Sequence, residues 1–181
     1  MTLTRWLPTF LGFPLGGFLA IETVGSLNGP LSAAAGGLLA GAVIGGGQWL
    51  ALRSRGIGRR WIGYTAAAMA AGTALASVVT GAGTELADLM ITGVVAGATV
   101  GAAQSVLLAR GRLVSAAWTG ITAASWSLGW LATSLVIGAD ADRGIYVFGA
   151  SGALLVTVLT GVALRTAFAA PTLPPVAAAS A

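Results

Sequence analysis

The sequence predicts an all-α integral membrane protein with six transmembrane helices, arranged as three tandem helix hairpins around a pseudo-threefold axis. The first observation is composition: 56% of the residues are hydrophobic, 8% are charged and the mean hydropathy is +0.91, whereas about a quarter of a soluble domain is charged. The second is the recurrence of apolar stretches of spanning length between the charged positions. The third is a glycine motif that returns at a spacing of 56 residues, which indicates an internal repeat.

Six stretches are long enough to cross a bilayer, for which a helix needs about 20 mostly apolar residues. They lie near residues 7–26, 31–52, 61–81, 88–109, 114–137 and 145–168. With their short connections they fill residues 1–170, which we expect to form one membrane domain with repeats 1–56, 57–112 and 113–170. The tail, 171–181, is rich in Pro and Ala, so we expect it to be disordered and cytoplasmic.

The first span contains two positions that an ordinary apolar helix lacks. Pro14 has no N–H and its ring clashes with the preceding turn, so it should kink the helix. Such a kink either forms part of a binding site at a broken helix or has no functional role, because Pro is common in ordinary membrane helices. Glu22 is ionisable and sits within the apolar run near its outer end, which makes it a candidate cation or proton site. The alternative is a water-exposed carboxylate at the end of the span.

The second, fourth and sixth spans share a face of small residues, one per helical turn. Its members are Gly37, Gly41 and Gly45; Gly93, Gly97 and Gly101; and, in weakened form, Gly149, Ala153 and Thr157. Residues four apart lie within about 40° of each other on a helix, so each set forms one narrow stripe. Because G-x-x-x-G stripes let membrane helices approach closely, we predict that these glycines are helix-packing positions, a glycine zipper.

One polar residue ends each stripe. Gln48 follows the first stripe, Gln104 the second, and Thr160 holds the third place. In the structural interpretation each side chain hydrogen-bonds a neighbouring helix, which contributes roughly 0.6 to 2 kcal/mol in a membrane bundle. In the functional interpretation the three form a polar constriction near the pseudo-threefold axis. The residues alone leave both interpretations open.

The third and fifth spans differ in bulk. The third is made largely of small residues, so we expect it to be central and surrounded by other helices. The fifth carries Trp126 and Trp130, which are four apart and therefore share a face. A Trp within the hydrocarbon region either fills the groove left by a neighbour's glycines or stacks on an apolar ligand. We therefore name both as candidate contacts for an apolar ligand such as a carotenoid, a quinone or a lipid tail.

The charges separate to the two ends of an up-and-down bundle. All but one of the nine basic residues, all of them Arg, fall at span ends on one side. The acidic residues Glu85, Asp88, Asp140 and Asp142 fall on the other. Arginine-rich short loops mark the cytoplasmic face, so we place both termini on the cytoplasmic side of a bacterial inner membrane. The bacterial assignment follows from the use of Arg without Lys, with abundant Ala, Gly and Val, as in GC-rich genomes.

Three tryptophans open the odd-numbered spans beside this basic face. They are Trp6, Trp61 and Trp118, and we interpret them as interfacial anchors. The sequence pI of about 11.2 also fits nucleic-acid binding. Since the arginines sit at span ends, membrane topology explains this pI, and we expect no nucleic-acid partner.

The sequence lacks most of the side chains that proteins use for catalysis and metal binding. The chain has no Cys, no His and no Lys, so it cannot form disulfides, thiolate or imidazole metal sites, Ser-His-Asp catalysis or a lysine Schiff base. We therefore expect no catalytic residue, no metal and no cofactor, other than a bound lipid or carotenoid.

Three functional hypotheses follow. The first is a non-enzymatic packing or accessory subunit, which associates through its glycine faces with copies of itself or with a larger membrane complex, surrounded by membrane lipid. The second is a small transporter or channel for a cation or small solute. The third is a binder of an apolar ligand.

One stretch carries a family resemblance. Gly41–Arg53 reads GAVIGGGQWLALR and is followed by Arg59, Arg60 and Trp61. It resembles a glycine-rich QWLxLR motif of small uncharacterised multi-spanning bacterial membrane proteins, and this resemblance implies no known activity. The three tandem helix pairs also resemble the plan of the mitochondrial carriers. Their signature of Pro, acidic and basic residues on the odd helices is absent here, so nothing is carried over from them.

Overall fold

The computed structural model describes residues 2–137 and 148–169, and this part of the chain is helical with short connections. Its elements are α1 (Leu3–Trp6), η1 (Leu7–Leu11), α2 (Gly12–Val24), α3 (Pro30–Leu52), η2 (Arg53–Arg55), α4 (Arg60–Thr80), α5 (Leu86–Leu108), α6 (Arg112–Ile137) and α8 (Ala150–Ala169). The helices coincide closely with the six predicted stretches. The predicted tail, 171–181, lies outside the described residues.

Four helices in the described part of the chain are long and apolar enough to cross a membrane, which is consistent with a membrane protein. They are Leu3–Val24, Pro30–Arg55, Arg60–Thr80 and Leu86–Leu108. Helix α6 carries Ser, Thr and Trp along its length, so it is less apolar than these four. The described apolar part of α8, Ala150–Thr166, is shorter. Every long helix nevertheless exposes large apolar side chains, as expected of a surface that faces lipid.

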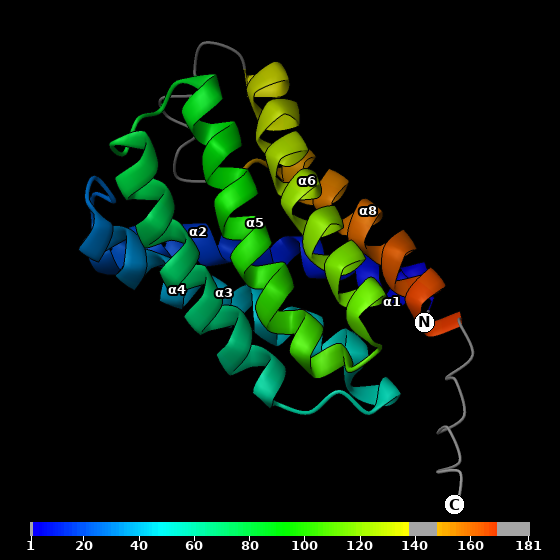
Figure 1. Cartoon of the computed structure of the whole chain (residues 1–181). Coiled ribbons are helices and arrows are strands. Elements are labelled where there is room, and N and C mark those ends of the chain that lie inside the picture. Colours follow the sequence, from blue (N-terminus) through cyan, green and yellow to red (C-terminus); the bar gives the residue numbers. More distant parts are fainter. Residues whose placement is uncertain (1, 138–147, 170–181) are drawn as a thin grey trace, which may run out of the picture.

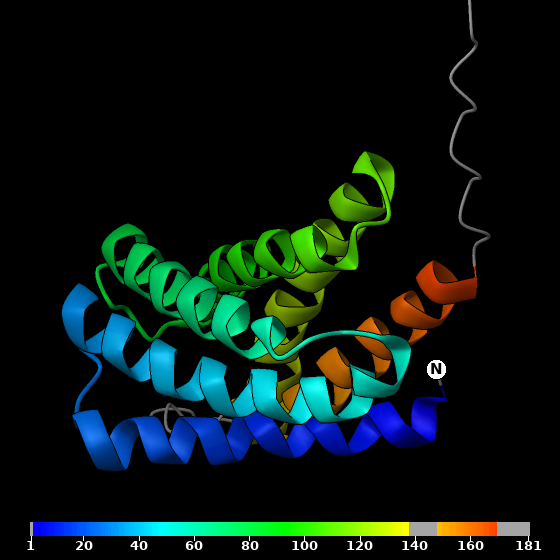
Figure 2. The same cartoon turned by 90° about the horizontal axis from the view of Figure 1, so that it is seen from below.

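The helices form a closed ring in chain order. Each long helix packs against the next one along the chain, and α8 packs back against α1, η1 and α2. Figures 1 and 2 show this order, with the orange α8 beside the blue first helix. In this order α4 is separated from α8 by two helices in either direction around the ring, so the two lie on opposite sides of it.

The two ends of the ring differ in charge. The end that we call the arginine end carries Arg5, Arg53, Arg55, Arg59, Arg60, Arg110, Arg112 and Arg165. The opposite, acidic end carries Glu22, Glu85 and Asp88. Asp140, Asp142 and Arg143, which the sequence assigns to the acidic end, lie outside the described residues.

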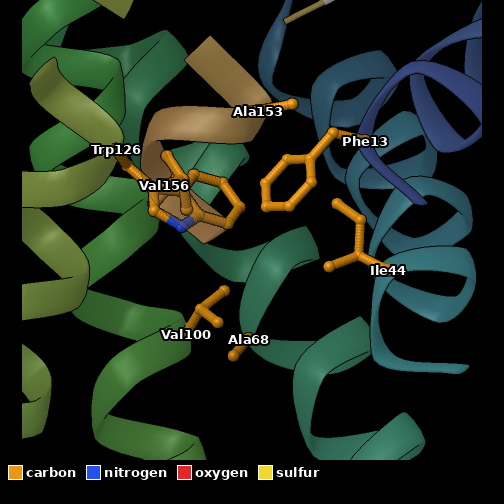
Figure 3. Close-up of a cluster of buried hydrophobic side chains, with 8 residues drawn as sticks. Phe13, Ile44, Ala68, Val100, Trp126, Ala153 and Val156 are labelled. Atoms are coloured by element: carbon orange, nitrogen blue, oxygen red, sulfur yellow. The ribbon is translucent and has the colours of Figure 1, made fainter. Parts of the chain in front are cut away.

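Two apolar clusters fill the interior. Side chains from α2 to α8 meet at mid-height in the first cluster, which consists of Phe13, Ile44, Ala68, Ala96, Val100, Trp126, Ala153 and Val156 (Figure 3). The second lies at the arginine end and consists of Trp6, Ala51, Leu52, Trp61, Leu108, Trp118 and Leu164. Both clusters draw on helices all around the ring, so neither level leaves an open axis.

The glycine stripes of α3 and α5 each face the next helix in the chain. A Cβ atom placed on Gly41 would lie 2.8 Å from the Cα of Ala66 on α4. A Cβ on Gly97 would lie 2.8 Å from the Cα of Ala123 on α6. Their neighbours in the stripes, Gly37, Gly45, Gly93 and Gly101, meet the same two helices at similarly short distances. The stripes of α3 and α5 therefore each contact a helix that we assigned to the next repeat. Gly149 is buried, and its N–H donates to Thr133 Oγ1 at 3.1 Å.

The irregular part of the first helix precedes Pro14. Residues Leu7–Leu11 form a 3₁₀-helix, and the α-helix resumes at Gly12. The N–H of Gly12 donates to the Thr9 carbonyl, which is the hydrogen-bond spacing of a 3₁₀ turn. Since Pro14 has no N–H to offer to the Phe10 carbonyl, a change of helix type at this point follows from the sequence.

A cavity with one aromatic and one hydroxyl wall, above a closed polar layer

A cavity of about 210 Å³ lies inside the ring toward its acidic end. Helices α2 to α6 line it, together with Phe148 just before α8. Its floor includes Ile44 and Ala96 of the mid-height cluster, and its rim reaches Leu27 and Gly83 in the loops of the acidic end. The cavity is therefore closed below by the core and lies next to the outer loops above.

Four aromatic side chains form one wall of the cavity. The rings of Phe13 and Trp126 lie edge to face with their centroids 5.5 Å apart, and Figure 3 shows them turned toward each other from α2 and α6. Phe148 stacks on Phe13 at 5.4 Å and meets Trp130 edge-on at 5.1 Å. Such arrangements are favoured by the quadrupoles of the rings. The structure thus brings the predicted pair Trp126 and Trp130 to one cavity wall.

The wall on α4 carries hydroxyl groups. Thr73, Ser77 and Thr80 line the cavity from one face of this helix, and Thr84 continues the line in the following loop. Thr73 Oγ1 lies 2.7 Å from the Ala33 carbonyl of α3, to which it can donate. Because α4 lies across the ring from α8, this wall opposes the one that contains Phe148.

Ser77 differs from its neighbours on that wall. Thr80 Oγ1 donates to the Ala76 carbonyl at 2.9 Å, whereas the buried Ser77 Oγ has no hydrogen-bond partner among the described residues. A buried polar atom without a partner costs about 1 to 3 kcal/mol. Ser77 is therefore a buried hydroxyl beside the cavity with unused hydrogen-bonding capacity in this part of the chain.

Below the core, Gln104 joins three helices at once. Its Nε2 donates to Gln48 Oε1 at 2.9 Å and to Thr65 Oγ1 at 3.0 Å. Its Oε1 accepts from Trp118 Nε1 at 3.3 Å, while Trp61 Nε1 donates to Gln48 Oε1 at 3.1 Å. Both amide side chains are buried. The two glutamines thus bond directly to each other across the repeat spacing.

The third place of this layer is occupied by Thr160 on α8. Its hydroxyl accepts from Trp6 Nε1 at 3.3 Å, and the same indole N–H donates to the Thr157 carbonyl at 2.9 Å. Thr160 Oγ1 in turn donates to the Val156 carbonyl at 2.7 Å. Each of the three tryptophans thus donates to the residue that ends a stripe, which is a glutamine twice and a threonine once.

The interpretation of these tryptophans as interfacial anchors was wrong. Trp6, Trp61 and Trp118 are 1%, 0% and 3% exposed, so they contact the interior of the bundle and not the headgroup region. An indole buried in this way needs an acceptor for its N–H, and the stripe-end residues supply one. Of the residues proposed as a polar constriction, Gln48 and Gln104 hydrogen-bond to each other and to indoles, and Thr160 hydrogen-bonds to Trp6 and to its own helix.

Glu22 lies away from the cavity. It is exposed in the last turn of α2, and it is not among the described residues that line the cavity. Nor does the described part of the chain contain a group of three or more Asp or Glu residues that could hold a metal ion. The structure thus puts the candidate cation site at the water-facing end of the helix.

Phe13, Phe148, Thr65 and Ser77 belong to the site but were not predicted. No spacing marks the two phenylalanines, since each is one of many apolar residues in its span. A signal for the indole pairs does exist: Trp61 lies 13 residues after Gln48, and Trp118 lies 14 after Gln104, across the same kind of turn. No family model, no curated protein and no solved structure matches this chain.

Proposed function

We propose that this chain is a non-enzymatic membrane protein that binds a ring-bearing apolar molecule in the cavity between its aromatic wall and its hydroxyl wall. The observation that carries the proposal is the pairing of four aromatic side chains with an unpartnered Ser77 hydroxyl around one cavity. Ligand sites combine a mostly apolar lining with a few polar groups that fix orientation. The lack of Cys, His and Lys in the sequence favours binding over catalysis.

The size of the cavity selects among the three ligand classes. Its volume of about 210 Å³ lies between that of an engineered cavity that binds benzene, about 150 Å³, and the roughly 300 Å³ at which drug-sized pockets begin. One six-membered ring with small substituents fits this space. A carotenoid or a lipid tail would have to leave most of its length outside, so a quinone-like ring is favoured.

We place this site in a six-span bundle made of three repeats. The stripe of α5 faces α6 from Gly93 beside Ser127 to Gly101 beside Thr119, so α6 shares the depth of a candidate span. Helix α8 packs between α6 and the first helix and exposes Val158 and Val162. The equivalent bonds of the three tryptophans support the threefold repeat. By the charge rule, the arginine end faces the cytoplasm of a bacterial inner membrane.

The accessory-subunit hypothesis stands as a second proposal with less support. The glycines on which it relied contact this chain's own helices, so a second copy or a larger complex would have to dock on another surface. A transport function would require the layer around Gln48 and Gln104 to open. That opening would break the hydrogen bonds of buried groups, each worth roughly 0.6 to 2 kcal/mol in a membrane bundle.

The test of the ligand proposal is extraction followed by direct binding. The protein is purified in native lipid, and its organic extract is examined by absorption and mass spectrometry for a ring-bearing molecule. Duroquinone, a tetramethyl benzoquinone, is then titrated into lipid-exchanged protein, with quenching of Trp fluorescence as the readout. We expect saturable quenching, weakened about 3- to 10-fold by Trp130→Leu through the loss of an aromatic contact.

Trp49→Leu is the matched control. Trp49 is also half-buried, but it lies at the arginine end, where the Arg59 guanidinium sits 5.6 Å from its ring. Its loss removes one fluorophore without touching the cavity, so duroquinone affinity should stay the same. The proposal fails if extracts contain no such molecule and duroquinone quenching does not saturate, or if both variants weaken binding equally.

A further inference from the structure

A second concave site lies on the outside of the bundle at the arginine end. This groove runs between the first helix and α3, and its lining residues are Arg5, Pro8, Thr9, Gly47, Leu50, Ala51, Arg53 and Ser54. The first helix and α3 come close at its inner side, where a Cβ on Gly47 would lie 4.0 Å from the Cα of Thr9. The groove is separate from the cavity and shares no lining residue with it.

The mouth of the groove carries uncompensated positive charge. Arg5 and Arg53 are both exposed, and Arg5 Nη1 donates to Ser54 Oγ at 3.4 Å. No carboxylate lines the groove within the described part of the chain. Two guanidinium groups beside one hydroxyl offer several donors to an anion, and guanidinium geometry matches that of a phosphate group.

The rest of the groove is apolar with one polar exception. Pro8 and Leu50 contribute its apolar surface, and Leu50 is 56% exposed. Thr9 is 5% exposed, and its Oγ1 has no hydrogen-bond partner among the described residues. Thr9 follows Arg5 by four residues, which places it about 6 to 8 Å deeper along the helix, at the level of Gly47. Leu50 lies three residues nearer the arginine end than Gly47, so the groove is cationic at its mouth, apolar at Leu50 and polar at its inner end, at Thr9.

We propose that this groove binds the headgroup and upper acyl chain of an anionic phospholipid. The phosphate lies between Arg5 and Arg53, the upper acyl chain lies against the exposed side chain of Leu50, and an ester oxygen reaches toward Thr9. Basic pockets between membrane helices at the cytoplasmic face bind anionic lipid headgroups for the same reasons. The inference depends on the membrane location of the chain and not on the proposed cavity ligand.

Native mass spectrometry of the full chain in detergent tests this site. Dioleoyl phosphatidylglycerol is titrated in, with dioleoyl phosphatidylcholine as the neutral lipid and inorganic phosphate as the free anion. We expect preferential binding of phosphatidylglycerol, weakened about 10- to 30-fold in the double variant R5Q/R53Q. Arg112→Gln is the matched control, because Arg112 is exposed at the same end but outside the groove. It should change the affinity less than about twofold.

A second variant guards against a folding artefact. Ser54→Asp places a carboxylate at an exposed position beside Arg5, so it should compete with the phosphate group and weaken lipid binding without altering the helices. Three results would overturn the proposal: equal binding of the two lipids, equal losses in R5Q/R53Q and R112Q, or complete displacement of the lipid by inorganic phosphate. The last result would assign the groove to a free anion.

Discussion

Gln104 shows how much one polar side chain can organise in a membrane bundle. It bonds Gln48 of α3, Thr65 of α4 and Trp118 of α6, and it is 1% exposed. Replacing it with Leu removes all three bonds and leaves the buried Trp118 N–H without its acceptor. We expect Gln104→Leu to lower the free energy of unfolding by about 1 to 3 kcal/mol.

Thermal unfolding in detergent, followed by circular dichroism, measures this loss. Thr160→Val is the internal comparison, because Trp6 keeps the Thr157 carbonyl as an acceptor at 2.9 Å after the hydroxyl is removed. Its effect should be smaller than that of Gln104→Leu. Equal or reversed effects would show that the glutamine pair is not the organising element of the layer.

Ser77 gives a prediction about ligand chemistry. Its hydroxyl is buried without a partner, so Ser77→Ala should leave the unliganded protein at least as stable. The same variant should weaken duroquinone about 2- to 10-fold, because one donor to a quinone carbonyl is lost. Durene, the hydrocarbon of the same shape, should bind both proteins equally.

Thr80→Val serves as the control, since the Thr80 hydroxyl already donates to the Ala76 carbonyl. Parallel losses for duroquinone and durene would contradict a hydrogen bond from Ser77.

At the scale of the helix, the stripe glycines are distinguished from other glycines by what surrounds them. A Cβ on Gly41 would lie 2.8 Å from the Cα of Ala66 and 2.9 Å from the Thr65 carbonyl oxygen. Both neighbours are backbone atoms, so the contact can be relieved only by moving α4. Gly46, on the same helix, has open space at its Cβ position. The two glycines differ in the space around the Cβ position because α4 packs against Gly41 and not against Gly46.

We therefore expect Gly41→Ala to destabilise the protein by about 1 to 3 kcal/mol, the usual cost of overpacking. Gly46→Ala should leave stability unchanged or raise it by up to about 1 kcal/mol, because Ala is the better helix former. Urea or thermal unfolding in detergent compares the two. If Gly46→Ala proved as harmful as Gly41→Ala, the intimate α3–α4 contact would not be the reason for the glycines.

The helices and the glycine stripes could be predicted from the sequence, because each follows from a requirement on neighbouring residues of one helix. The thickness of a bilayer sets the number of apolar residues that a spanning helix needs, and the predicted stretch 31–52 is indeed close to α3, Pro30–Leu52. Close backbone approach fixes small residues at a spacing of four, which identified Gly41 and Gly97. The helix that each stripe contacts could not be predicted, since periodicity identifies a face of a helix but not the neighbour that packs against it.

Side-chain environment was the least predictable feature. A Trp at a span end suits either the headgroup region or the bundle interior, and only the fold shows that Trp61 is fully buried against Gln48. The cavity wall formed by Phe13, Trp126 and Phe148 joins residues of distant spans. No local pattern encodes such a meeting of side chains. The two tryptophans named in advance were found by their unusual depth.

At the scale of the whole molecule, the ring has a different content at each level. Buried indoles and amides fill the arginine end, an apolar cluster fills the middle, and the cavity lies toward the acidic end. The same ring order creates both walls of the cavity, because α4 faces Phe148 across the interior. A bundle closed at one end in this way can hold a ligand that enters from the other.

The proposed six-span arrangement predicts which segments share a side of the membrane. The sequence has no Cys, so single cysteines report topology without a background signal. We expect Ser54→Cys and Thr166→Cys to react on one side of sealed vesicles with a membrane-impermeant maleimide, and Ser26→Cys and Ala150→Cys to react on the other. All four positions are exposed in the structure. Ala150 decides the question, because it is the first residue of α8 and follows α6 in the chain.

Two controls make the labelling interpretable. Detergent-opened vesicles should label all four variants, which shows that each thiol is reactive, and Gln104→Cys should stay unlabelled because that position is 1% exposed. If Ala150→Cys reacted on the same side as Ser54→Cys, α6 and α8 would not cross the membrane. The cavity walls at Trp130 and Phe148 would then lie at a different depth, and the ligand proposal would lose its site within the membrane.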